Sequence, residues 1–558
     1  MDDFRILVSI DFGTTYSGFA YVHKENPETV VVNNSWPGKE GAPKAPTALQ
    51  YDNGYKNVTS WGNLALEEDP DEEEPDDTER QRPRPVELFK LHISNLRKKE
   101  LPWLPPQLHY TKAIEDYITQ MRKLIQVTLE RRWPTINFPQ QVGFVLTIPA
   151  EWPPHTTKVM RECAYKAGLL TSLNSQQLEF TTEPEAAALH CLSVIKEHNL
   201  QPNDSFLVAD CGGGTVDLTL RKLLPENKLS EITERVGDLC GSTFVDKEFL
   251  HWLGRKVGFQ ALAKLKTDNY GQMQYLVQRF FCTRIKFKFN GEKKDYKTLK
   301  LNLQHYCPSL PQHVVDEIKE QMEEAGWILK VDYETVKEMF DPVIDRIINL
   351  IDDQLKSSSE KNCSAMFLVG GFSESPYLLR RVKETFEHQV PIIAVPAVPI
   401  AAIVRGAITY GLNVDKDIVP DRVLKWTYGI EVCRPWVSGD KPSKRTKDGM
   451  YLYFHELARR GSNVKVNQKF SGDFYPIRPN QDIITFNVYY TSKYEAKYCI
   501  DPGMRLLGVI KVKTYDTHLG LNRPIEFSLA FGKVEIKATA KNKSTGEIYN
   551  ETTLELTL

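Results

Sequence analysis

The stretch RILVSIDFGTTYSGFAYV, residues 5–22, places an acidic residue and a small hydroxylated turn between two β-rich apolar runs. The first run ends at Asp11, and Gly13, Thr14 and Thr15 precede the second. Small side chains in such a turn let backbone amides approach an anionic ligand, and threonine hydroxyls donate further hydrogen bonds. A carboxylate there would repel a phosphate unless a cation lay between them, which predicts a magnesium shell at Asp11. Taken alone, the pattern also fits an ordinary hairpin.

A second stretch about 200 residues later, VADCGGGTVDLTLRKL, repeats this design of apolar strand, acidic residue, glycine turn, threonine and second strand. Its acidic residue is Asp210, and its glycines are Gly212, Gly213 and Gly214. Three consecutive glycines lose much conformational entropy on folding, so close approach of a ligand to the backbone explains them better than chance. We predict that the two turns face each other across a cleft and hold the phosphates of a nucleotide. Asp11 and Asp210 would then share one hydrated metal ion.

A third glycine turn, LVGGFSESP with Gly370 and Gly371, also follows a buried apolar run. Its glycines would let a flat base or a ribose lie against the backbone, although a plain strand-to-helix turn explains them equally well. Phosphate-binding loops of two well-known kinds lie at strand-to-helix junctions. No such junction of this chain carries their sequence patterns, which are G-x-x-x-x-G-K-[ST] and G-x-G-x-x-G. The pattern is therefore neither a Walker loop nor a dinucleotide fingerprint.

The composition indicates a multidomain globular protein. The 558 residues exceed what one hydrophobic core usually supports, which predicts two to four domains. The net charge is only −2, and the 71 basic and 73 acidic residues are mixed along the chain, so no nucleic-acid partner is expected. The acidic run at 67–79 is typical of a solvated loop, with a partner-docking tail as the alternative.

The cysteines and the N-terminus indicate a cytoplasmic protein, with the nucleus as the alternative. The nine cysteines are scattered, form no C-x-x-C pair and lie mostly in apolar surroundings, as reduced thiols do. Asp2 and Asp3 stand where a signal peptide would have basic residues, and the apolar run at 6–10 is too short for a membrane span. The cysteines are Cys163, Cys191, Cys211, Cys240, Cys282, Cys307, Cys363, Cys433 and Cys499.

The pattern of the chain changes near residue 412. Before it, strand signals such as VGFVLTIPA (142–150) and AMFLVGG (365–371) alternate with long helical patterns, which is typical of α/β layers. The segment at 111–133 has apolar residues at helical spacing and predicts a helix with one packed face. After residue 412, runs such as DIITFNVYYTSK and IEFSLAF alternate apolar and polar residues, which predicts a small all-β domain.

Six motifs, in order, resemble those of the 70-kDa heat-shock chaperone family of the actin-like ATPase superfamily, and most closely its divergent "heat shock 70 kDa protein 12" branch. IDFGTTYSG is similar to the family's first phosphate motif, VADCGGGTVDL to the second and FLVGGFSESPYL to the adenosine motif. TIPAEW resembles the strand at the lobe contact, and TTEPEAAAL and IVRGAITYGL resemble the two connecting helices.

The resemblance implies a role for each matching residue. The phosphate-contacting residues would be Gly13, Thr14, Thr15, Gly212, Gly213, Gly214 and Thr215. Asp11, Asp210 and Glu183 would hold magnesium, mainly through water. Lys90 stands where the family keeps the lysine that orients the attacking water, and with these three carboxylates it would form the catalytic group. Two alternatives stay open: Glu183 as a helix cap beside Pro184, and Lys90 as a surface lysine.

The adenine side departs from the family's pattern. Glu374 falls where the chaperones place an arginine against the adenine, so a cation over the base is lost. Lys286 matches the family's adenine-contacting lysine only loosely, and Thr283 replaces an acidic residue there. Contacts of Lys286, Gly370 and Gly371 with the nucleotide are therefore expected in an altered adenine site.

The β-rich region resembles the chaperones' peptide-binding sandwich. WTYGIEV is similar to its first strand, LLGVIKVK to a middle strand and KVEIKATAKNKSTGE to its final hairpin. The helical lid and the acidic tail that recruits cochaperones have no counterpart, and VDKDIVPDR replaces the leucine-rich linker. We expect this region to bind a polypeptide client or a folded partner, with weakened coupling to ATP.

The expected fold is α/β, with a two-lobed actin- or ribonuclease-H-like ATPase domain at 1–413 and a small all-β sandwich at 414–558. Lobe I would cover about 1–204, lobe II about 205–390 and a return helix about 391–413. The resemblance implies a weak ATPase that uses ATP, ADP and Mg²⁺ to control lobe closure and protein binding. A nucleotide exchange factor or cochaperone would be a further partner. The alternatives are a nucleotide-regulated scaffold with little or no hydrolysis and, least favoured, a small-molecule kinase.

Overall fold

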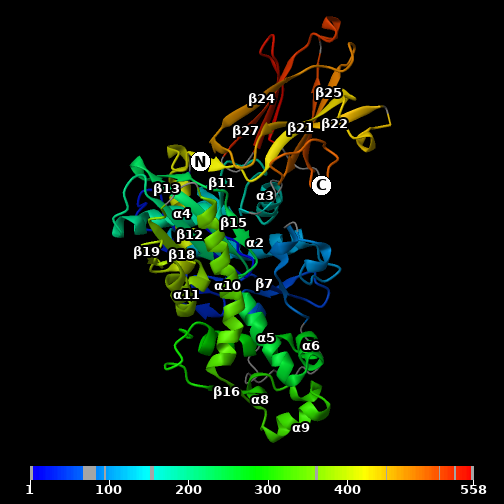
Figure 1. Cartoon of the computed structure of the whole chain (residues 1–558). Coiled ribbons are helices and arrows are strands. Elements are labelled where there is room, and N and C mark those ends of the chain that lie inside the picture. Colours follow the sequence, from blue (N-terminus) through cyan, green and yellow to red (C-terminus); the bar gives the residue numbers. More distant parts are fainter. Residues whose placement is uncertain are drawn as a thin grey trace. The chain divides into compact units, whose positions relative to one another are not determined.

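The structure is a computed structural model, and it describes residues 4–66, 83–93, 96–150, 152, 156–358, 362–447, 449–514, 516–532 and 536–553 (Figure 1). The chain divides into two compact units. Unit 1 comprises Met1–Trp152, Arg161–Leu220 and Val236–Lys416, and unit 2 comprises Pro153–Met160, Arg221–Arg235 and Asp417–Leu558. The acidic run at 67–79 lies outside the described residues.

The first sheet of unit 1 contains the opening stretch of the sequence. Its strands are β1 (Ile6–Asp11), β2 (Tyr16–His23), β3 (Val31–Val32), β6 (Ala45–Pro46), β10 (Val142–Ile148) and β11 (Leu178–Thr182). They are ordered β11-β10-β1-β2-β3, with β6 paired to the start of β2. β1 lies antiparallel to β2 and parallel to β10. The strand expected at 142–150 is thereby confirmed.

The second sheet repeats this order. Its strands are β12 (Ser205–Cys211), β13 (Val216–Leu224), β14 (Lys228–Glu231), β15 (Val236–Asp238), β18 (Ala365–Val369) and β19 (Ile392–Ala394). They are ordered β14-β13-β12-β18-β19, with β15 paired to the start of β13. β12 lies parallel to β18, as β1 does to β10. In both sheets a glycine turn follows the strand that carries an aspartate near its end, so the internal repeat seen in the sequence is confirmed.

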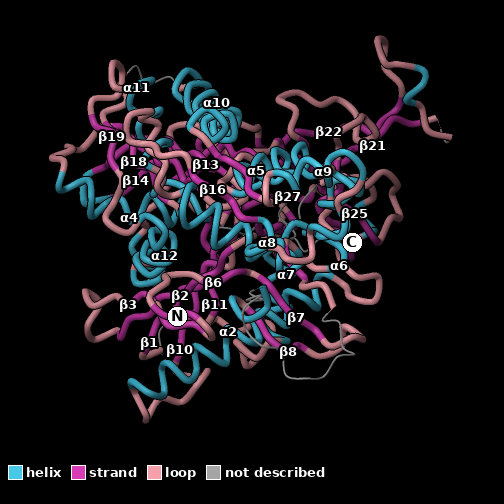
Figure 2. Tube along the Cα trace, turned by 90° about the horizontal axis from the view of Figure 1, so that it is seen from below, coloured by secondary structure: helices cyan, strands magenta, loops and turns pink. Residues whose placement is uncertain are grey.

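Two helices connect these sheets. They are α4 (Glu183–Glu197) and α12 (Ala402–Leu412). α4 packs against β12 of the second sheet, α12 packs against β1 of the first, and the two helices lie side by side (Figure 2). Thr182 caps the start of α4 by accepting a hydrogen bond from the Glu185 amide, and Pro184 fits the first turn because its missing N–H would have no partner there. The helix pair therefore holds the ends of β1 and β12 in one arrangement.

The helix expected at 111–133 is confirmed as α2 (Tyr110–Arg132), with one buried apolar face. The other helices are α1 (Asn63–Leu66), α3 (Thr156–Lys166), α5 (Thr243–Val257), α6 (Phe259–Asp268), α7 (Tyr270–Tyr275), α8 (Leu303–Tyr306), α9 (Asp316–Glu324), α10 (Tyr333–Ser357) and α11 (Pro376–Phe386), and a wide π-type segment spans Leu276–Lys286. The short strands are β4 (Ser35–Trp36), β5 (Lys39–Glu40), β7 (Ala48–Tyr51), β8 (Val58–Trp61), β9 (Val86–Glu87), β16 (Leu299–Asn302) and β17 (Ile328–Val331). Within the part of the chain that the structure describes, each helix is too short or too polar to cross a membrane.

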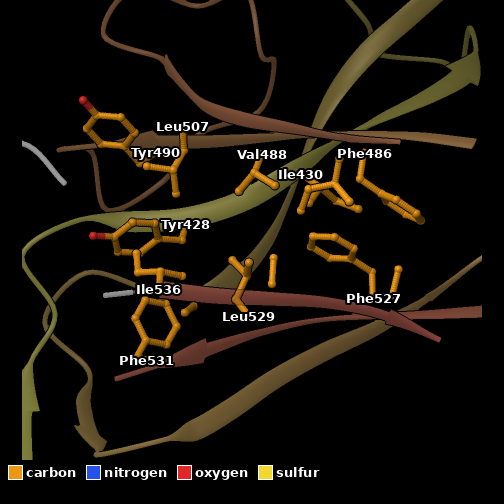
Figure 3. Close-up of a cluster of buried hydrophobic side chains, with 14 of the residues drawn as sticks. Tyr428, Ile430, Phe486, Val488, Tyr490, Leu507, Phe527, Leu529, Phe531 and Ile536 are labelled. Carbon is orange, nitrogen blue, oxygen red and sulfur yellow. The ribbon is translucent and has the colours of Figure 1, made fainter. Parts of the chain in front are cut away.

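Unit 2 contains two antiparallel sheets that share one core. One is ordered β22-β21-β25-β26 and the other β24-β27-β28-β29. Their strands are β21 (Thr427–Pro435), β22 (Met450–Ala458), β24 (Gln468–Phe474), β25 (Ile483–Thr491), β26 (Arg505–Lys513), β27 (Ile525–Phe531), β28 (Ile536–Asn542) and β29 (Ile548–Thr553). Alternate side chains of both sheets point into one apolar cluster (Figure 3), in which the rings of Phe486 and Phe527 stack with centroids 4.6 Å apart. The all-β pattern expected after residue 412 is confirmed in these strands.

A short segment of the second sheet belongs to unit 2, although the sequence analysis assigned it to lobe II. The Val423 amide donates to Glu231 Oε2 over 2.8 Å, and Ser230 Oγ donates to Asp421 Oδ1 over 2.8 Å. These contacts join β14 to β20 (Asp421–Val423), which pairs in turn with β23 (Asn463–Lys465). The β14 segment is therefore packed on the strands that follow residue 416.

All nine cysteines lie in the described part of the chain and carry free thiols, as expected. Seven of them are buried, and Cys363 and Cys433 are half-buried. Burial raises the pKa of the Cys163 thiol, which agrees with unreactive thiols in apolar surroundings.

Candidate functional site

The two glycine turns predicted from the sequence lie against each other. A Cβ placed on Gly213 would lie 2.2 Å from Thr15 Oγ1, and one on Gly214 would lie 3.7 Å from Thr14 Cγ2. Any larger residue at position 213 would therefore force the Thr15 side chain to shift. The structure brings together the segments 13–15 and 212–215, which lie about 200 residues apart in sequence.

Each turn is fixed by the segment that packs behind it. In the first, the Thr47 amide donates to the Thr15 carbonyl over 2.8 Å, and Thr47 Oγ1 donates to the Gly13 carbonyl over 2.9 Å. In the second, the Thr243 amide donates to the Gly213 carbonyl over 2.9 Å, and the Gly212 amide donates to the Thr215 carbonyl over 2.9 Å. The turns are thus shaped before any ligand arrives, which lowers the entropy lost on binding.

The third glycine turn reaches the same place. Gly370 has φ +83°, and a Cβ there would lie 2.4 Å from Asp210 Oδ1 and 2.5 Å from the Cys211 carbonyl oxygen. Only glycine combines that backbone conformation with so close a contact. Gly371 is different, since a Cβ there would first meet Ile400 Cδ1 at 3.5 Å. Gly370 therefore lies at the aspartate of the second turn.

Lys90 is buried beneath the first turn. Its side chain is 1% exposed, its Nζ donates to Glu183 Oε1 over 3.0 Å, and a second short hydrogen bond goes to the Phe12 carbonyl. The Nζ also lies 4.8 Å from the ring centroid of Trp152. The alternative of a surface lysine is therefore wrong. Since Thr182 caps α4 and the Glu183 carboxylate binds Lys90, the alternative of a helix cap at Glu183 is wrong as well.

The three predicted carboxylates are buried and act on one another. Burial, and then the neighbouring carboxylate of Glu183, raises the pKa of Asp210 to about 7, while Lys44 opposes this rise and Asp11 adds to it. Burial also raises the pKa of Glu183, against the attraction of Lys90. Mutual repulsion of this kind favours the protonated form of a carboxyl group, and a nearby cation opposes that effect.

Lys44 is the residue that sequence reasoning missed. Its Nζ lies 2.5 Å from Asp11 Oδ2, and the other oxygen, Asp11 Oδ1, accepts a 3.3 Å hydrogen bond from Thr147. Burial lowers the pKa of Lys44, but attraction to Asp11, Asp210 and Glu183 outweighs it, so the pKa is raised overall. The only local signal was an isolated lysine between two prolines in GAPKAPT.

A lysine lies on the carboxylate of Asp11, where the magnesium shell was expected. Both carboxylate oxygens already have partners, and one partner is an ammonium group that cannot ligate a metal ion. Across the described residues, no group of three or more His, Cys, Asp or Glu side chains could hold a metal ion directly, whereas the shell expected at Asp11 would act mainly through water. A metal at Asp11 would have to displace Lys44.

Lys286 is buried in an ion pair of its own. Its Nζ lies 2.8 Å from Asp246 Oδ1 and 2.9 Å from Oδ2, and its side chain is 3% exposed. Asp246 neutralises this ammonium, which leaves less charge for an adenine contact than the resemblance implies. Thr283 and Glu374 are exposed.

Several known proteins are similar to this chain in sequence. A family model described as a domain of unknown function, DUF8340, matches residues 198–395. Heat shock 70 kDa protein 12A of Homo sapiens is 26% identical over 98% of this chain and 90% of its own length. Heat shock 70 kDa protein 12B of Homo sapiens is 26% identical over 97% of this chain and 90% of its own length. The chain is related to the 70-kDa heat-shock proteins.

The likeness to this heat-shock family extends beyond the protein 12 branch. Chaperone protein HscA of Buchnera aphidicola is 24% identical over 77% of this chain and 75% of its own length. The three glycine turns of this chain come from the three motifs that resemble the phosphate and adenosine motifs of the 70-kDa heat-shock proteins. Lys44 forms its ion pair with Asp11 of the first of these motifs, although it lies in none of the six.

Proposed function

We propose that this heat-shock relative binds ATP between its two facing glycine turns and hydrolyses it slowly. The observation that carries the proposal is the contact of Gly213 with Thr15 beside three buried carboxylates and two buried lysines. Turn amides and threonine hydroxyls are donors suited to phosphate oxygens. We further infer that the two sheets of unit 1 are the cores of two actin-like lobes, which nucleotide would draw together because it contacts both.

Lys90 is the group best placed to assist hydrolysis. Its ammonium has three N–H donors, and the described residues supply two acceptors, the Phe12 carbonyl and Glu183 Oε1. The third N–H is available to a water molecule or to a γ-phosphoryl oxygen. In-line attack of that water on the γ-phosphorus breaks the bond to the β–γ bridging oxygen and leaves ADP and phosphate. The magnesium expected at Asp11 is not carried into this proposal, since Lys44 occupies that carboxylate.

A test of ATP binding and turnover uses the wild type and Asp210→Ala. We expect the wild type to bind ATP and ADP and to convert ATP in a single-turnover assay, and Asp210→Ala to lose at least about tenfold in turnover. Binding would be followed by calorimetry and product by chromatography. Turnover that survives in Asp210→Ala contradicts this site, and binding without turnover moves the protein to the scaffold class.

The third turn gives a separate prediction with a control one residue away. Gly370→Ala is expected to weaken ATP binding about tenfold or more, because the added Cβ pushes the turn away from Asp210 and Cys211. Gly371→Ala has room for its Cβ and should keep affinity within about threefold of the wild type. The measurement is the dissociation constant for ATP. Equal losses in both variants would show that the turn does not hold the nucleotide by close approach.

For unit 2 we propose that the sheet containing β25 and β26 binds a polypeptide partner, as the peptide-binding sandwich of a chaperone does. The outer face of that sheet exposes Ile483, Leu506 and Val509, which are apolar side chains without cover in the described chain. Apolar side chains grouped on one sheet face are typical of a protein-binding surface. Residence in the cytoplasm or nucleus stays an expectation.

A further inference from the structure

Lys44 is placed by contacts that serve the first turn. The segment that carries it pairs with β2, where Ala45 lies opposite Ser17 and Pro46 opposite Tyr16. Thr47 then fixes this segment by its hydrogen bonds to the first turn. The Tyr117 hydroxyl donates to the Pro46 carbonyl over 3.1 Å. Lys44 therefore leaves a segment that is anchored on the opening hairpin.

The stem of Lys44 lies across a glycine of β2. A Cβ on Gly18 would lie 3.0 Å from Lys44 Cγ and 2.9 Å from the Pro43 carbonyl oxygen. Any larger residue at position 18 would displace the stem, so glycine makes the room for it. The Lys44 side chain is 13% exposed, which separates it from the surface lysines of this region such as Lys39.

The ammonium of Lys44 is the positive charge closest to Asp11. It lies 2.5 Å from Asp11 Oδ2, and the carboxylates of Asp210 and Glu183 also attract it. The other buried cation of the site, Lys90, is bound to Glu183 and the Phe12 carbonyl. Each lysine therefore neutralises a different carboxylate among the three that were expected to share a metal ion.

A divalent cation and Lys44 compete for the same position. Magnesium requires oxygen ligands at about 2.0–2.1 Å in octahedral geometry, and it usually retains several waters. The Lys44 ammonium already takes a position 2.5 Å from Asp11 Oδ2, so an ion bound directly to that oxygen would have to displace it. An ammonium is a compact point charge that binds phosphate oxygens well, so it can take over the neutralising role.

We propose that Lys44 supplies the cation for the phosphates of the bound nucleotide, so that the protein binds ATP and ADP without a divalent metal ion. The inference rests on the ATP site proposed above. The phosphates would lie between the turn amides of both sheets, with Lys44 between Asp11 and the nearest phosphate oxygen. Lys44 is in this sense a binding residue that none of the matching motifs contains.

The experiment compares nucleotide affinity with and without divalent metal. Binding of ATP and of ADP to the full chain is measured by calorimetry in excess EDTA and in excess Mg²⁺. We expect the two dissociation constants of the wild type to agree within about threefold, because the protein already supplies the cation. This comparison needs no substitution and does not depend on any variant folding.

Two variants then assign the effect to Lys44. Lys44→Met is expected to weaken ATP binding in EDTA by about tenfold or more, and Mg²⁺ should restore part of the loss. The control is Lys39→Met, which changes an exposed lysine that also follows the opening hairpin in the sequence. Its dissociation constant for ATP should match that of the wild type in EDTA and in Mg²⁺. Urea unfolding shows whether each variant is folded. If Lys44→Met is not folded, Lys44→Met/Asp11→Asn takes its place, because it removes both charges of the ion pair.

The outcomes separate this inference from the proposed function. Wild-type binding that requires Mg²⁺ overturns the role of Lys44 and leaves the ATP site standing. Failure to bind nucleotide in both conditions overturns the ATP site and the inference with it. Equal binding of Lys44→Met and wild type in EDTA also overturns the inference, because the charge would then come from another group.

Discussion

Gly406→Ala is expected to lower the free energy of unfolding of unit 1 by about 3 kcal/mol, at the upper end of overpacking effects. A Cβ at position 406 would lie 1.7 Å from the Ala186 carbonyl oxygen and 2.5 Å from its carbonyl carbon. These are backbone atoms of α4, so rotation of a side chain cannot relieve the overlap. The helices α4 and α12 would have to separate, and they connect the two sheets.

The sign of this effect distinguishes packing from helix propensity. In an exposed helix, glycine to alanine stabilises by about 1 kcal/mol, so propensity alone predicts the opposite result. Gly411→Ala is the matched control in α12, because its Cβ would meet the side-chain atoms Leu7 Cδ2 and Val145 Cγ2, both at 2.7 Å, which can shift. Urea unfolding should show a clearly smaller loss for Gly411→Ala. A stabilised Gly406→Ala would contradict the close helix contact.

The glycine turns could be predicted from the sequence because their signal is local. A strand, an aspartate and consecutive small residues imply a tight turn and a close approach wherever they occur. The repeat of that pattern also indicated that the two turns act as a pair, and the structure places Gly213 against Thr15. The repeat of the strand order in the two sheets is a finding of the structure.

The position of Lys44 could not be predicted, because it depends on contacts between distant segments. The ion pair joins residues 33 positions apart, and the strands β2 to β5 lie between them in the sequence. The same reason applies to the β14 segment, which packs on strands about 190 residues later through Glu231 and Asp421. Local residue types decide where a strand or a turn forms, whereas long-range pairing decides which charges meet.

The Lys90–Glu183 pair gives the largest effect expected on catalysis. Lys90→Met should slow single-turnover ATP hydrolysis by about 10²–10³-fold, because it removes the ammonium that we propose as donor to the attacking water and the γ-phosphate. The same change leaves the buried Glu183 carboxylate without its ammonium. Breaking one side of a buried pair destabilises a protein by about 3–5 kcal/mol, so the free energy of unfolding should fall as well.

Lys90→Met/Glu183→Gln separates these two effects. The double variant has no buried charge left unpaired, so its free energy of unfolding should return to within about 1–2 kcal/mol of the wild type. Hydrolysis should stay slow, since the lysine donor is still absent. Urea unfolding and single-turnover assays on the wild type, Lys90→Met and the double variant provide both readouts. If hydrolysis recovers together with stability, Lys90 acts only by keeping Glu183 paired, and the water-orienting role is wrong.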